Sequence, residues 1–143
     1  MPIVYRIDHE QKVVLTRGYG AFTDEDVFTY QRTVWSRPDV AGYSELVDMA
    51  FVTDIPIPSI HRVRDLAAKA ASMDQRDGSA RMAIAASDDH AFGLGRMFET
   101  YKSLDQRTTK HVGVFRTFAE AVAWLGISEP EMPEIPTEAH RAD

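Results

Sequence analysis

Apolar and polar residues alternate in two ways along the first 126 residues, and each way predicts a kind of secondary structure. Short runs rich in β-branched residues predict five strands, and these lie at 3–7, 12–19, 45–49, 81–86 and 110–115. Only the short turn 8–11 separates the first two strands. We therefore expect them to pair as an antiparallel hairpin.

Apolar residues at helical spacing predict four helices between and after the later strands. Thr23 and Asp26 have the capping-box spacing, and Pro38 is expected to stop this first helix soon after Trp35. The other three helices are expected to begin at Ser59, at Ser87 or Asp88, and at Thr117, with Gly126 ending the last.

This order of elements, β-β-α-β-α-β-α-β-α, predicts an α/β domain. Strands separated by helices imply right-handed crossovers and a largely parallel sheet, whereas the hairpin adds an antiparallel edge. The predicted fold is a mixed, mostly parallel five-stranded sheet with an N-terminal antiparallel hairpin and four helices. The length of 143 residues fits one such domain, which we place at 1–126.

The final segment, 127–143, differs in composition from the rest of the chain. Its sequence ISEPEMPEIPTEAHRAD has prolines at 130, 133 and 136 and five acidic residues against Arg141. Regularly spaced prolines interrupt helix and sheet, and few apolar groups remain to be buried. We expect an extended, solvated, flexible tail, with an acidic partner-binding tail as the alternative.

Composition excludes several classes of protein. A net charge of -6 argues against non-specific nucleic-acid binding, and the absence of cysteine removes disulfides and thiolate chemistry. The opening MPIVYRIDHE has charges where a secretory leader would be apolar, and no apolar run is long enough to span a membrane. We expect a cytoplasmic protein that is not membrane-spanning.

Few residues suggest catalysis, a cofactor or a metal. Gly93 and Gly95 form a G-x-G inside a predicted helix, where close helix packing explains them better than phosphate binding. Asp88, Asp89 and His90 are an acid-base candidate, yet acidic residues at a helix start more simply cap it. The histidines are scattered, so we expect no metal site and no cofactor.

The segment 45–68, ELVDMAFVTDIPIPSIHRVRDLAA, resembles the central part of STAS domains, the sulfate-transporter and anti-sigma-factor-antagonist modules. In that family an apolar strand ends in an Asp-containing turn, and a Val-Thr-like pair leads to a serine at a helix start. The stretches 87–99 and 114–126 look like a bacterial branch called SpoIIAA-like or STAS/SEC14-like. Its members are mostly small stand-alone proteins of unknown role.

The resemblance implies a non-enzymatic regulatory or protein-interaction domain. Its docking face would include Ser59, His61 and Arg62, and Ser59 would be the counterpart of the phosphorylated serine. Aligned through Val52 and Thr53, however, Pro58 stands at the serine position and Ser59 follows one residue later. A plain helix-capping role is the alternative for Ser59.

Two further functions remain open. The branch also resembles lipid carriers, and this implies as an alternative a small apolar ligand or lipid in a cleft formed by Phe92, Arg96, Met97 and Tyr101. An enzyme would rest only on Arg96 beside these aromatic residues, with Asp88 to His90 near the helix start. The strand at 3–7 is a free edge through which we expect a homodimer.

Overall fold

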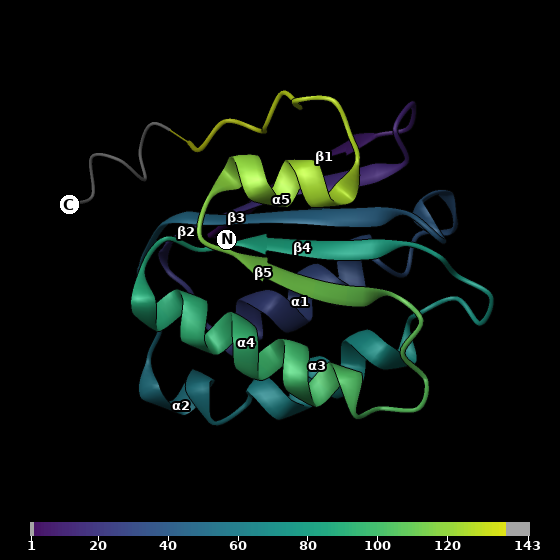
Figure 1. Cartoon of the computed structure of the whole chain (residues 1–143). Helices are drawn as coiled ribbons and strands as arrows, with labels where there is room; N and C mark the ends of the chain where they lie inside the picture. Colours follow the sequence, from purple (N-terminus) through teal and green to yellow (C-terminus); the bar gives the residue numbers. More distant parts are fainter. Residues whose placement is uncertain (1, 137–143) are drawn as a thin grey trace.

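The protein, described here by a computed structural model over residues 2–136, is built on one five-stranded sheet. The strands are β1 (Ile3–Asp8), β2 (Val13–Ala21), β3 (Ser44–Asp54), β4 (Arg81–Ala85) and β5 (His111–Phe115). They lie in the order β1-β2-β3-β4-β5, with β1 antiparallel to β2 and every other neighbour parallel (Figure 1). The predicted mixed α/β fold is confirmed.

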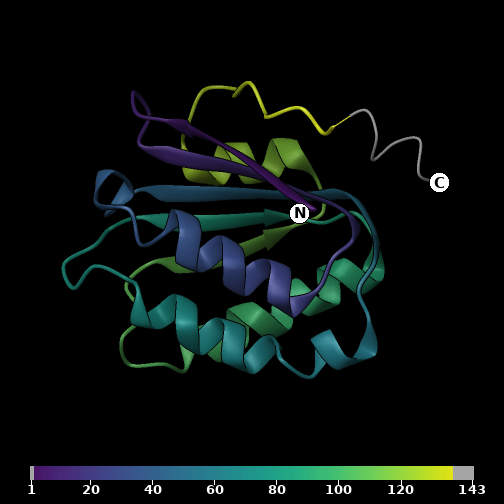
Figure 2. The same ribbon diagram turned by 180° about the vertical axis from the view of Figure 1, so that it is seen from behind.

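Helices cover both faces of the sheet. These are α1 (Asp24–Val34), α2 (Ile57–Ile60), α3 (Val63–Ser72), α4 (Asp89–Ser103) and α5 (Phe118–Leu125), with a 3₁₀ turn at Pro38–Val40. Figures 1 and 2 show α5 on one face and the other helices on the opposite face. The molecule therefore has three layers, and among the described residues α5 is the only helix on its face of the sheet.

Three of the predicted helix starts are confirmed. Thr23 accepts a hydrogen bond from the Asp26 N–H in a reciprocal capping box, and Asp88 caps α4 by accepting from Ala91. Thr117 caps α5, and Gly126 ends it with a left-handed φ of 71°.

The prediction at Ser59 is wrong in its local structure. Pro56 is the N-cap of the short helix α2, and Ser59 lies inside that helix. The separate helix α3 follows, with Arg62 as its N-cap. Pro58 suits the first turn of a helix, so the helix starts before Ser59 rather than at it. The chain consequently has five helices over the described range instead of four, and β3 continues to Asp54 rather than ending at residue 49.

Strand residues point alternately to the two faces, and this alternation builds two hydrophobic clusters. On the α5 face, Val13, Leu15 and Leu46 pack with Ala83, Ala85, Ala121 and Leu125. On the α1 face, Ile3 and Val14 pack with Tyr30, Val34 and Val40. Because both faces are covered, consecutive residues of β2, Val13, Val14 and Leu15, are all completely buried.

The C-terminal segment contacts the domain as far as it is described. Residues 127–136 form no helix or strand, as predicted, but Ile127 and Met132 pack against the α5-side cluster. The Arg6 and Arg17 side chains donate to the carbonyls of Glu131 and Pro133. Residues 127–136 therefore lie against the domain at these points, while the flexibility expected for the segment stays a prediction and 137–143 lie outside the described part.

Candidate functional site

A cavity of about 180 Å³ lies between the sheet and the helices α1, α3 and α4. Its walls are mainly apolar side chains from both layers, including Val27, Val47, Leu66, Ile84, Leu94 and Phe98. The sheet residues among them are those whose side chains point away from α5. The cavity is thus a feature of one face of the sheet.

Polar side chains form one end of the cavity, at the edge where β3 and β5 begin. The Tyr30 hydroxyl donates to Glu45 Oε2 over 2.6 Å and shares a 2.7 Å hydrogen bond with Thr16. The Trp35 Nε1–H lies 3.3 Å from the same Glu45 oxygen. Burial and the Glu45 carboxylate raise the pKa of Tyr30 well above its usual value, so this hydroxyl stays protonated.

Lys110 lies beside this group, directly before β5. Its Nζ is 3.9 Å from Glu45 Oε1 and 3.2 Å from the centroid of the Trp35 ring. Burial lowers the pKa of Lys110 to about 8, although the carboxylates of Glu45 and Asp74 partly oppose this effect. The lysine is therefore mostly charged at neutral pH and held by a carboxylate and a ring face.

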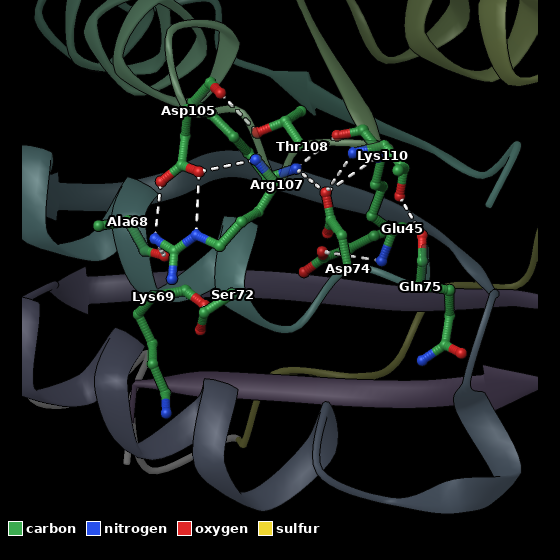
Figure 3. A network of polar contacts seen from close by, with 12 residues as sticks. Glu45, Ala68, Lys69, Ser72, Asp74, Gln75, Asp105, Arg107, Thr108 and Lys110 are labelled. Atoms are coloured by element: carbon green, nitrogen blue, oxygen red, sulfur yellow. Dashed lines mark hydrogen bonds and ion pairs between the residues drawn. The ribbon is translucent and has the colours of Figure 1, made fainter. Parts of the chain in front are cut away.

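A second buried ion pair closes this end of the cavity. Lys102 Nζ lies 2.7 Å from Asp74 Oδ2, with 1% and 4% of the two side chains exposed. The same Asp74 oxygen accepts from the backbone N–H groups of Thr109 and Lys110 (Figure 3). Two carboxylates thus balance two amines, and Asp74 joins the segment after α3 to the start of β5.

The other end of the cavity contains Ser59 and Asp24. Ser59 is only 6% exposed, donates to Asp24 Oδ1 over 2.8 Å, and accepts from the Asp24 N–H. A phosphate on this oxygen would stand against the Asp24 carboxylate, where like charges repel. Modification of Ser59 therefore requires α2 to move away from α1 first.

The other two residues of the predicted docking face are exposed. His61 is on the surface, and Arg62 pairs with Asp65 over 2.9 Å and lies over the Phe28 ring. Ser59 is buried beneath this surface with its side chain directed toward Asp24, and the Arg62 guanidinium lies 3.9 Å from the other oxygen of the same carboxylate.

The residues predicted to form an apolar cleft lie on α4, as expected, but they do not line this cavity. The α4 residues that line the cavity are Ala91, Leu94, Gly95, Phe98 and Lys102, a stripe at helical spacing. Of the residues predicted to line it, Met97 and Tyr101 are 37% exposed, Arg96 pairs with Glu99 on the surface, and Phe92 lies under the Arg116 guanidinium.

Gly95 allows α4 to approach the sheet closely. A Cβ at this position would lie 3.0 Å from Val114 Cγ1, whereas one at Gly93 would meet nothing within 4 Å. The packing interpretation of the G-x-G therefore holds for Gly95. The nearby acidic residues lie elsewhere: Asp88 caps α4 and Asp89 pairs with Arg116 over 2.6 Å at the surface.

Sequence reasoning missed the polar end of the cavity. The signal was present, since Glu45 and Lys110 are charged residues beside otherwise apolar strands, and Lys102 is a charge in the buried stripe of α4. Charged residues are rarely buried without partners, so such positions indicate a paired cluster.

Comparison with known proteins shows the fold. No family model matches the chain, and no curated protein matches it. Among solved structures, an uncharacterised protein of the DUF3478 family with a SpoIIAA-like fold, from Shewanella loihica PV-4, is similar with a TM-score of 0.56. It is 18% identical, and the match covers 86% of this chain and 93% of that one.

The chain thus has a SpoIIAA-like fold, in agreement with the resemblance found in its sequence. Across residues 2–136, no helix is both long enough and apolar enough to cross a membrane.

Proposed function

We propose that this SpoIIAA-like domain binds one small, mostly apolar ligand in the cavity between the sheet and helices α1, α3 and α4. The observation that supports the proposal is a space of about 180 Å³ with apolar walls from both layers. An apolar cavity of about 150 Å³ suffices to bind benzene in another protein. The size therefore fits a single substituted ring or a short chain, not a whole phospholipid.

The charges at the cavity end support binding rather than catalysis. Glu45 is engaged by Tyr30, Trp35 and Lys110, and Asp74 is engaged by Lys102 and two backbone N–H groups. A general acid or base needs a proton it can exchange with substrate, whereas these groups are committed to one another. We propose that they close and rigidify the cavity.

The regulatory docking face at His61 and Arg62 stays a prediction, as do the homodimer and the cytoplasmic location. A ligand-binding domain of this kind can also regulate a partner. The cavity alone, however, supports ligand binding more directly than docking, because Ser59 is buried against Asp24.

Tryptophan fluorescence tests the proposal. Trp35 lines the cavity and Trp124 packs on Phe115 away from it, so Trp124→Phe leaves one reporter at the site. We expect p-xylene or p-cresol to change the Trp35 emission saturably. Val47→Phe should abolish this response by filling the cavity, whereas Met97→Phe, at an exposed position of α4, should preserve it.

Native mass spectrometry of freshly purified protein adds a second measurement. Absence of any bound small molecule, together with no saturable response of Trp35 to either compound, would refute the proposed function. Binding that survives Val47→Phe unchanged would also refute it, because the ligand would then lie elsewhere.

A further inference from the structure

One polar atom in the cavity wall lacks a partner. Gln31 lies on α1, is 5% exposed, and lines the cavity. Its Nε2–H donates to the Leu66 carbonyl of α3 over 3.2 Å. Among the side chains of the described residues, Gln31 Oε1 is the buried polar atom with no hydrogen-bond partner.

The orientation of this amide follows from its bond to α3. A carbonyl oxygen accepts only from a donor, so the nitrogen of the amide must face Leu66 and the oxygen must be the free atom. An unpaired buried acceptor is costly, and native proteins seldom retain one without a water, an ion or a ligand.

Other polar groups of the cavity wall are already engaged. The Tyr30 hydroxyl donates to Glu45, and the Ser59 hydroxyl donates to Asp24. Because Gln31 lines the cavity, an occupant of the cavity is in position to supply the donor that Oε1 lacks. An aliphatic or purely aromatic occupant would leave the oxygen unpaired.

We infer that the ligand has one hydrogen-bond donor, a hydroxyl or an amino N–H, on an otherwise apolar ring or short chain, and that Gln31 selects for it. This inference rests on the proposed function and narrows its ligand class. A cavity with apolar walls and one free acceptor favours alcohols and phenols over hydrocarbons of equal size, because only the former complete the hydrogen bond.

The isosteric pair p-cresol and p-xylene tests this selection, since the two differ only by a hydroxyl in place of a methyl group. Both are titrated by calorimetry into the wild type and into Gln31→Met, which keeps the length of the side chain and removes the acceptor. We expect p-cresol to bind the wild type at least as tightly as p-xylene. In Gln31→Met the affinity for p-cresol relative to p-xylene should fall roughly tenfold.

Gln11→Met is the matched control, because Gln11 bonds Asp8 and Ser128 and does not line the cavity. It should leave both affinities unchanged. Thermal unfolding checks that each variant is folded. If Gln31→Met does not fold, the comparison of the two compounds in the wild type still tests the inference. Without a partner for its hydroxyl, p-cresol would bind the wild type much more weakly than p-xylene.

The outcomes separate the two proposals. If neither compound binds the wild type, the proposed function fails. If both bind but p-xylene is favoured tenfold or more, or if Gln31→Met leaves the ratio unchanged, the cavity binds ligands without help from Gln31. The donor inference is then overturned while the proposed function stands. A water molecule that stays bound to Gln31 Oε1 would leave the ratio of the two affinities unchanged in Gln31→Met.

Discussion

The two faces of the sheet are built from the same strands but packed differently. On the α5 face, Leu46, Ala83 and Ala121 are completely buried and belong to one hydrophobic cluster. On the opposite face, the neighbouring residues Val47 and Ile84 border a cavity of about 180 Å³. Leu46 and Val47 are adjacent in β3, yet Leu46 packs in a filled core and Val47 borders a cavity.

The difference shows how one sheet can combine stability with a binding site. A single short helix rests directly on small residues on the α5 face, so side chains fill the space between the layers. Several helices pack against one another over the opposite face, and polar pairs such as Lys102 with Asp74 lie at one end of the cavity there. The filled face can stabilise the fold while the other retains space for a ligand.

The largest expected effect comes from removing a charge at the closed end of the cavity. Asp74→Ala leaves the Lys102 ammonium and two backbone N–H groups without their acceptor. Breaking one partner of a buried ion pair costs about 3–5 kcal/mol, and we expect a loss of that size in urea unfolding. Arg107→Ala, which breaks an exposed pair with Asp105, should cost far less. Equal losses would contradict the assigned burial.

Overpacking each face should change the unfolding free energy by a smaller amount, and it compares the two faces directly. Leu46→Phe forces an aromatic ring into the filled face and should cost about 2–3 kcal/mol of unfolding free energy. Val47→Phe adds more volume, yet it enters the cavity and should cost less than about 1 kcal/mol. The reverse order would show that the cavity is not available to a larger side chain.

Alkaline pH probes the hollow face through Lys110. Its pKa is lowered from 10.5 to about 8 on folding, so between these values the unfolded chain binds more protons. The unfolding free energy should therefore rise with pH from about 8 to 10, by about 1–2 kcal/mol. Above pH 10 Tyr30, whose pKa is raised, has the opposite effect.

Lys110→Met is the variant that isolates this contribution. Its unfolding free energy should lack the rise between pH 8 and 10 when both proteins are unfolded in urea across the pH series. A rise of equal size in the variant would assign the effect to other groups.

The smallest effects concern the helix caps on the two faces. Thr23→Ala and Thr117→Ala each remove an N-cap, worth about 1 kcal/mol. Of these two helices, α1 borders the cavity and α5 does not, so Thr23→Ala should also weaken p-xylene binding, while Thr117→Ala should not. Calorimetric titration of both variants measures this, and equal effects would mean that the faces are mechanically coupled.

The sequence predicted the elements better than their relation in space. The hairpin and the caps at Thr23, Asp88 and Thr117 follow from local patterns, because turns and capping hydrogen bonds involve nearby residues. The start of α2 was missed, since the helix begins with proline at its first turn instead of at the serine that follows.

The site was harder to predict because it joins distant residues. Asp74 meets Lys102 and the backbone at Lys110, and Tyr30 meets Glu45, across separations that no local spacing reveals. The side of α4 that faces the sheet was also ambiguous. Phe92 and Phe98 are both aromatic, and only Phe98 lines the cavity, on the stripe that includes Gly95.

Gly95 has a consequence for how such a site can change in size. At this point the α4 backbone contacts the Val114 side chain of β5 directly, so the absence of a Cβ at Gly95 sets the distance between the helix and the strand. An alanine there would place its Cβ 3.0 Å from Val114 Cγ1, so α4 or the Val114 side chain would have to shift slightly. A single substitution at Gly95 would thus alter the spacing between α4 and the sheet while the other residues that line the cavity stay the same.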